Sequence, residues 1–158
     1  MRQPSGEEVT GAQRPRVRAG ALVARKNEVL LVRHKSQGPP YFLLPGGGVN
    51  YLETAAEAVV REVWEETGYR VTPGPLLWVS ETIPKNGVRH TLHLTFACEI
   101  LGKEHEGGMD ERVAEVCWIP LEELLTLRLH PPYARIIYTY LTEGRLPVNP
   151  YLGKLWLD

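Results

Sequence analysis

The segment from Gly46 to Tyr69 reads GGGVNYLETAAEAVVREVWEETGY and predicts a single helix behind a run of glycines. Thr54 and Glu57 have the spacing of a capping box, which favours a helix start. Small and apolar side chains then recur at helical intervals. Gly68 suits the left-handed residue that ends such a helix. We therefore expect a loop, a helix and a second loop, with the apolar face of the helix anchored in the core.

The opposite face of this helix gathers three carboxylates. Glu62, Glu65 and Glu66 stand at i, i+3 and i+4, so their side chains share one face. Like charges at this spacing weaken a helix by roughly a few tenths of a kcal/mol per pair unless a counter-charge offsets them. A cluster of hard oxygen ligands is what Mg²⁺ or Mn²⁺ prefers. Taken alone, the spacing also fits a solvated acidic face.

The residues just before the helix add to this pattern. Glycines let the backbone turn sharply and approach a ligand closely, and a backbone carbonyl there can supply another oxygen. Glu53 lies in the loop near the helix start. Arg61 follows two turns later and can reach back to pair with Glu53, which would fix the loop.

These residues match every position of the Nudix signature, GX₅EX₇REUXEEXGU, in which U is a bulky apolar residue. The match runs from Gly47 to Tyr69, with Tyr69 at a position where Ile, Leu or Val is more usual. Seven fixed identities at ~6–7% frequency each would arise by chance on the order of once in 10⁸ start positions. The chain therefore resembles the Nudix hydrolases, and the order of its expected elements over residues 17–140 is similar to theirs.

The resemblance implies an α/β fold in which a mixed β-sheet is sandwiched between helices. It also implies a Mg²⁺-dependent hydrolase that cleaves diphosphate linkages, with Mn²⁺ as an alternative ion. The metal ligands that it implies are the carboxylates of Glu62, Glu65 and Glu66 and the carbonyl of Gly46.

The catalytic residues also follow from the resemblance. Members of the family differ in the carboxylate that acts as base, and some use a glutamate from a later loop. Glu111 is the first candidate for that role here, with Asp110 and Glu115 as alternatives. The catalytic set implied by the resemblance is Glu53, Arg61, Glu65, Glu66 and Glu111.

Residues outside the signature point to the substrate less specifically. Arg33 opens a basic run over residues 33–35 that can bind phosphate, although a polar strand end explains it too. Tyr41 precedes the glycines and can stack on a base, or simply pack. Pro84 lies fifteen positions after the signature, a distance that resembles the mark of the ADP-ribose-cleaving subgroup.

We therefore expect a nucleotide substrate, specifically a nucleoside diphosphate derivative with ADP-ribose favoured. Oxidised nucleoside triphosphates and dinucleoside polyphosphates are the alternatives within the same chemistry. A catalytically silent nucleotide-binding module is the alternative from another class, and it usually shows a broken signature. Removal of the 5′ diphosphate from RNA is disfavoured by the near-zero charge.

Length and composition indicate one domain in a reducing compartment. The 158 residues fit a domain over residues 16–158 after a flexible tail over residues 1–15. A net charge of −1 argues against binding to DNA, RNA or an anionic membrane. Cys98 and Cys117 lie in apolar runs and are expected to be reduced thiols, with a disulfide or a zinc site as the alternative.

Several expectations concern location and assembly. The N-terminus lacks the apolar stretch of a signal peptide, and no apolar run is long enough to span a bilayer, so we expect a cytoplasmic protein. The family resemblance implies a homodimer. The apolar tail over residues 151–158 is expected either to dock on the domain or to form a dimer contact.

The remaining elements are expected from periodicity and turn signals. We expect a hairpin of residues 17–24 and 28–33, and further strands over residues 41–44, 69–72, 76–81, 90–100 and 115–119. Helices are expected over residues 121–127 and 131–141.

Overall fold

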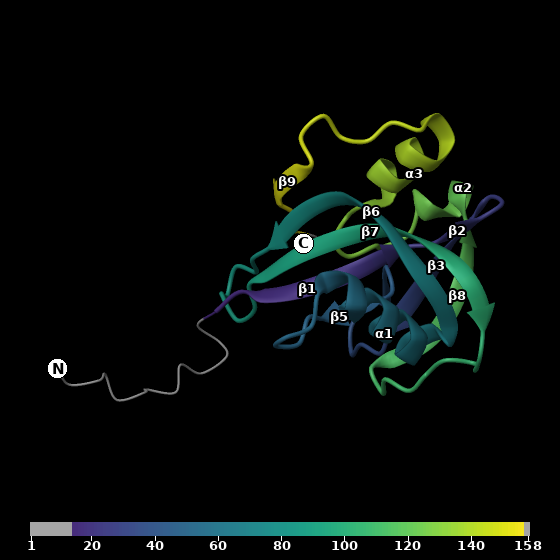
Figure 1. Cartoon of the computed structure of the whole chain (residues 1–158). Helices are drawn as coiled ribbons and strands as arrows, with labels where there is room; N and C mark the ends of the chain where they lie inside the picture. The colour runs from purple at the N-terminus through teal and green to yellow at the C-terminus, as the bar shows by residue number, and fades with distance from the viewer. Residues whose placement is uncertain (1–13, 157–158) are drawn as a thin grey trace.

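The computed structural model describes residues 14–156, so the expected tail over residues 1–15 lies almost wholly outside the described part (Figure 1). The elements in chain order are β1 (Arg16–Leu22), β2 (Ala24–Arg25), β3 (Glu28–His34), β4 (Tyr41–Leu43), β5 (Gly46–Gly48), α1 (Ala55–Thr67), β6 (Tyr69–Thr82), β7 (Thr91–Lys103), β8 (Val113–Pro120), α2 (Leu121–Leu124), α3 (Ala134–Glu143) and β9 (Tyr151–Lys154). None of the helices in the described part is long and apolar enough to cross a membrane.

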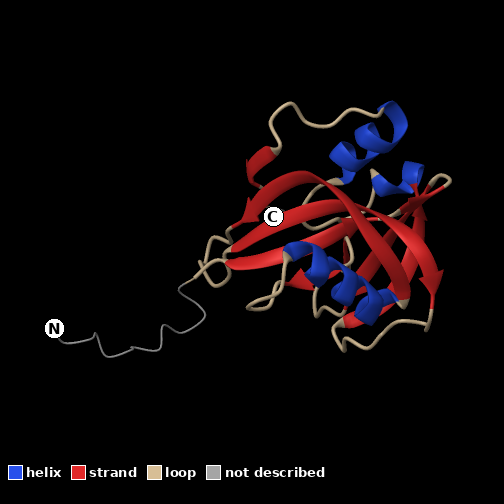
Figure 2. Cartoon of the chain, in the orientation of Figure 1, coloured by secondary structure: helices blue, strands red, loops and turns tan. Residues whose placement is uncertain are grey.

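The strands form two sheets of mixed direction. The larger sheet has the order β5-β1-β7-β6-β9, and the smaller one contains β2, β3 and β4, with β8 paired to β3. Strand β1 is antiparallel to β5 and parallel to β7, while β6 and β7 form a long antiparallel pair. Helix α1 lies on one side of the strands and helices α2 and α3 lie on the other (Figures 1 and 2). The expected mixed α/β architecture is confirmed.

Two apolar cores lie on the two sides of the strands, because successive strand residues point to opposite faces. Leu30 of β3 belongs to the core under α1, together with Val59 and Val63 of that helix. Its neighbour Leu31 belongs to the other core, which includes Ile137 of α3. The strands are thus buried on both faces, and α1 is anchored by its apolar side.

The expected hairpin of residues 17–24 and 28–33 is wrong in its main part. Only Ala24 and Arg25 pair with β3, whereas β1 belongs to the other sheet. Residues 19–23 are all buried, as in a central strand covered on both faces. Both edges of β1 are taken by β5 and β7, so no edge is left for β3.

Other differences have local causes. Strand β6 is continuous through Pro73, with register shifts instead of the expected break, since a bulge can accommodate proline in a strand. The glycine run, expected as a loop, forms β5. Helix α2 ends at Leu124, and α3 begins at Ala134, after the cis peptide bond before Pro131 and not at that proline.

The apolar C-terminal tail docks on its own domain. Strand β9 pairs in parallel with β6, and the Leu155 N–H donates to the Glu81 carbonyl at 2.8 Å. Leu152 and Leu155 pack against the core that includes α3. Over residues 151–156 the tail is therefore part of the larger sheet, while residues 157–158 lie outside the described part.

Candidate active site

Helix α1 begins and ends as its sequence predicts. The Thr54 hydroxyl accepts from the Glu57 N–H at 3.1 Å, and the Glu57 carboxylate accepts from the Thr54 N–H at 2.8 Å. Gly68 ends the helix at φ 80°, in the left-handed region that glycine favours. The loop after β7 closes over this end, and a Cβ on Gly68 would overlap the carbonyl of His105. The helix is therefore fixed at both ends.

Arg61 fixes the loop before the helix. Its Nε and Nη2 donate to the two carboxylate oxygens of Glu53, each at 2.8 Å, and Nη2 also donates to the Gly48 carbonyl at 3.0 Å. These hydrogen bonds lower the pKa of Glu53 to about 2, so this carboxylate stays ionised. The predicted Arg61–Glu53 pair is confirmed. The third donor, Nη1, lies 2.7 Å from Oε1 of Glu62.

The carboxylates of Glu62, Glu65 and Glu66, here called the acidic cluster, lie beside the glycine strand. The carboxylate of Glu62 packs so closely on Gly47 that a Cβ there would overlap it. Burial, opposed by Arg61, raises the pKa of Glu62. Glu66 is 1% exposed and accepts the Gly46 N–H at 2.7 Å. Gly47 thus needs to be a glycine because a carboxylate occupies the place of its side chain.

The donor chemistry of the acidic cluster fits a hard divalent cation. Its donors are carboxylate oxygens on one rigid helix, and Oε2 of Glu62 accepts no hydrogen bond from the described residues. No three acidic, histidine or cysteine side chains within residues 14–156 are already gathered as a metal cage. Instead, the Arg61 guanidinium contacts both Glu62 and Glu65. Arg61 is therefore the counter-charge that the clustered carboxylates require.

A cavity of about 270 Å³ opens beside Gly46 and Gly47, next to the acidic cluster. Its charged lining is cationic, and it also holds three histidines. These residues are Arg16, Arg18, Lys35, Arg89, Arg112, His34, His93 and His130. Such a lining suits a ligand with several negative charges.

Four of these cations, here called the cationic wall, are Arg16, Arg18, Lys35 and Arg89. Within the part of the chain that the structure describes, no carboxylate lies in ion-pair distance of any of them. Arg18 donates to a backbone carbonyl, that of Leu44, at 2.8 Å, and burial lowers its pKa. Arg16 and Arg18 are half-buried and Lys35 and Arg89 are exposed, so this wall presents unpaired positive charge that an anionic ligand can reach.

The cavity is lined by some, but not all, of the residues predicted to contact the substrate. Tyr41 and Pro84 line the cavity, and so do His34 and Lys35 of the basic run. Arg33 does not line it, and its Nε donates instead to Glu115 at 3.0 Å. Neighbouring residues of a strand point to opposite faces, which separates Arg33 from His34.

The three candidates for the base, Asp110 and Glu111 of the loop before β8 and Glu115 of β8, do not line the cavity. Glu111 is exposed, and Glu115 is paired with Arg33. Asp110 holds Arg112, whose hydrogen bonds lower the pKa of Asp110 to about 2. Arg112 is therefore what this loop contributes to the lining, and a base at Glu111 stays a prediction.

The sequence interpretation missed most of the cationic wall. Arg16 and Arg18 alternate on β1, a spacing that places both on one face and could have signalled a shared site. His93 of β7 is 5% exposed and also lines the cavity. Its Nε2 meets Thr82 Oγ1 at 2.8 Å, while its Nδ1 has no partner. Arg89 lies in the loop between β6 and β7, and its position gave no signal.

Comparison with known proteins identifies the family. A family model described as NUDIX domain matches residues 14–140, and the chain therefore belongs to the Nudix family. The signature from Gly47 to Tyr69 lies within the matched residues, and the chain is a Nudix hydrolase.

Its relatives carry several activities in their names. An ADP-ribose pyrophosphatase from Methanocaldococcus jannaschii is 35% identical over 104 residues, which cover 64% of this chain and 60% of that protein. The human diphosphoinositol polyphosphate phosphohydrolase 3-beta is 32% identical over 126 residues, which cover 79% of this chain and 75% of the human protein. A NUDIX hydrolase from Nitrosomonas europaea superposes with a TM-score of 0.73 at 22% identity, covering 85% of this chain and 94% of that one.

Proposed function

We propose that this chain hydrolyses the diphosphate linkage of a nucleoside diphosphate derivative, with Mg²⁺ as cofactor and Mn²⁺ as a substitute. The observation that carries the proposal is the intact acidic cluster on α1 beside a cavity with a cationic lining. The M. jannaschii relative named as an ADP-ribose pyrophosphatase supports the same reaction.

The chemistry requires charge neutralisation, since a diphosphate is anionic and resists an anionic nucleophile. A divalent ion held by Glu62, Glu65, Glu66 and the Gly46 carbonyl would supply neutralisation and make a coordinated water more acidic. Arg16 and Arg18 would bind and orient the phosphates, because guanidinium groups form paired hydrogen bonds with them.

The chain's own carboxylates would complete the reaction. Glu111, or in its place Glu65 or Glu66, would accept the proton of the attacking water, a role that typically contributes about 10²–10⁴-fold. The water oxygen joins one phosphorus as its bond to the bridging oxygen breaks. The products are a nucleoside monophosphate and a second phosphate compound.

ADP-ribose is the favoured substrate, because Pro84 lines the cavity. The test is hydrolysis of ADP-ribose to AMP and ribose 5-phosphate, with Mg²⁺, Mn²⁺ or neither. Oxidised nucleoside triphosphates, dinucleoside polyphosphates and triphosphorylated RNA belong in the same panel. If no member of the panel is hydrolysed, the proposed reaction is rejected, and the chain is better described as a catalytically silent nucleotide-binding module.

A second candidate substrate is a polyphosphorylated compound that carries a diphosphate group. The cationic wall favours it, because four cations without carboxylate partners exceed what one diphosphate needs. The human relative named as a diphosphoinositol polyphosphate phosphohydrolase points the same way. Including a diphosphoinositol polyphosphate in the panel decides between the two candidates by their kcat/KM.

We also propose that the enzyme acts on small molecules in the cytoplasm and not on nucleic acid, and that it forms a homodimer. Its net charge of −1 supports small-molecule substrates, since its cations are concentrated in one cavity. Analytical ultracentrifugation tests the dimer, and a monomer at micromolar concentration would reject it.

A further inference from the structure

A second recess adjoins the cavity. It has a volume of about 210 Å³ and is lined by Tyr41, Arg128, His130 and Trp156. Three of these residues, Tyr41, His130 and Trp156, also line the cavity beside the glycine strand. The two spaces are therefore neighbours, and one ligand can extend from the recess towards the acidic cluster.

We propose that this recess binds the nucleobase of the substrate, and that Trp156 of the C-terminal tail forms its outer wall. The inference rests on the proposed nucleotide hydrolysis and deepens it by placing the base. No residue of the Nudix signature contributes to the recess, so the signature alone does not indicate it.

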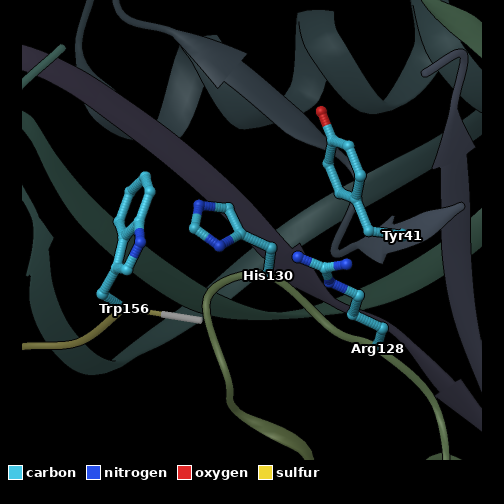
Figure 3. Close-up of a pocket in the computed structure, with 4 residues that line it drawn as sticks. All are labelled: Tyr41, Arg128, His130 and Trp156. Atoms are coloured by element: carbon cyan, nitrogen blue, oxygen red, sulfur yellow. The ribbon is translucent and has the colours of Figure 1, made fainter. Parts of the chain in front are cut away.

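The rings of the recess are arranged to receive a flat group. Figure 3 shows His130 between Trp156 and Tyr41, with Arg128 below Tyr41. The His130 ring stands at 83° to both neighbours, with its centroid 6.2 Å from that of Tyr41 and 5.1 Å from that of Trp156. A base entering the recess can place its face on Tyr41 or Trp156, and such stacking tolerates any base.

Polar groups at the recess can meet the edge of a base. Arg128 is exposed, and no carboxylate among residues 14–156 pairs with it. Burial, with Arg18 and Arg128, lowers the pKa of His130, so its imidazole is neutral at pH 7 and can both donate and accept. The edge of a base can therefore meet Arg128, a cationic hydrogen-bond donor, and His130, which can act as donor or acceptor.

The backbone holds the recess in place before any ligand binds. The Phe42 N–H donates to the Arg128 carbonyl at 2.9 Å, and the His130 N–H donates to the Phe42 carbonyl at 2.8 Å. These bonds tie the floor of the recess to β4. Trp156 follows Leu155, whose N–H is bonded to β6, so the tail brings the indole to the recess from the far end of the chain.

The test is binding of AMP against ribose 5-phosphate, which lacks the base, measured by calorimetry on the full chain. We expect the wild type to bind AMP about tenfold more tightly, and Trp156→Ala to lose that advantage while its affinity for ribose 5-phosphate is unchanged. Trp156→Phe should restore AMP binding, because a phenyl ring still stacks. Val148→Ala, an exposed position in the same C-terminal segment, is the matched control and should bind both as the wild type does.

Two results would overturn the inference. One is that the wild type binds AMP and ribose 5-phosphate equally, and the other is that Trp156→Ala weakens both ligands alike. Circular dichroism checks that the tail stays docked, and Tyr41→Leu provides a second variant with the same expected loss if Trp156→Ala unfolds. The binding measurement does not depend on turnover. If the chain binds AMP through its base but hydrolyses no substrate, the proposed reaction is rejected and the assignment of the recess to the nucleobase stands.

Discussion

The acidic cluster lies beside the cavity that the cationic wall lines, and the two regions are built in different ways. Glu62 and Glu65 are contacted by Arg61, and Glu66 accepts a backbone N–H, so the cluster is satisfied by its immediate surroundings. The cationic wall has no carboxylate partner in the described part of the chain. A satisfied cluster keeps its geometry without ligand, whereas the unpaired wall gains most when an anion arrives.

The two regions also differ in how the chain encodes them. The acidic cluster comes from little more than one turn of α1. Glu53, which binds Arg61, lies just before that helix. The cationic wall is assembled from β1, the loop that follows β3 and the loop that follows β6. We infer that the acidic cluster, which comes from one helix, carries out the reaction, and that the cationic wall, which comes from several elements, selects the substrate. Each variant below tests one side of that division.

The largest effect is expected from Glu66→Gln. The amide keeps an oxygen that can accept the Gly46 N–H but loses the charge, so kcat should fall about 10²–10⁴-fold with little change in melting temperature. Steady-state kinetics and circular dichroism measure the two. Glu106→Gln, at an exposed glutamate, is the control and should keep full activity. Full activity in Glu66→Gln would place the chemistry elsewhere.

A smaller loss is expected from Gly47→Ala. The new methyl group overlaps the Glu62 carboxylate, which can turn away because it is the end of a flexible side chain. Activity should therefore fall about 10²-fold, as for a misplaced catalytic group, while stability changes by less than about 1 kcal/mol. Gly102→Ala, where a methyl group meets open space, is the matched control. A variant that loses stability without losing activity would contradict the role assigned to Gly47.

On the cationic side, Arg16→Gln should raise KM about 10- to 100-fold and leave kcat within a factor of two. Removing one charged hydrogen bond to phosphate costs roughly 1.5–3 kcal/mol of binding, and that bond is expected in ground and transition states alike. Kinetics at low and high salt measure it, since the wild-type KM should rise with salt more steeply than the variant's. Arg145→Gln, at an arginine paired with Glu143 away from the cavity, is the control. A fall in kcat alone would show that the wall takes part in the reaction itself.

The smallest effect concerns His93, buried behind the cationic wall. Burial, then Arg18, His130 and Arg16, lowers its pKa to about 3, against about 6.5 in an unfolded chain. As the pH falls below about 6.5 the unfolded chain binds the proton first, so stability declines from there towards pH 3 and is unaffected above. At pH 5 we expect His93 to account for a loss of ~1–2 kcal/mol, and His93→Gln should remove this contribution while that of His130 stays. Urea unfolding at pH 7.5 and pH 5 measures this, and equal losses in both proteins would exclude His93 as the cause.

The sequence predicted the local parts of the molecule well. The capping box, Gly68 and the Arg61–Glu53 pair depend on residues within one element and its flanks, and the structure has all three. Spacing along the chain is enough for such features, because the helix converts it directly into geometry.

The same reasoning could not assemble the rest of the site. Within the basic run over residues 33–35, the sequence does not separate Arg33 from His34, because residues 29–32 are buried on both faces and alternation does not reveal which side meets the cavity. The separation of β1 from β3 depends on which strands occupy the edges of β1, and Arg89 and Trp156 reach the cavity only through that arrangement. These contacts are long-range, and nothing in the nearby residues specifies them.

Strand β9 has a consequence for how the protein is made. It pairs with the edge of β6 and is itself the outer strand of the larger sheet, but the hydrogen bond between Tyr151 and Glu81 joins residues 70 positions apart. During synthesis β6 therefore emerges long before its partner, with an open edge that can pair with another nascent chain. The arrival of this short strand ends the interval in which the growing chain is most exposed to aggregation.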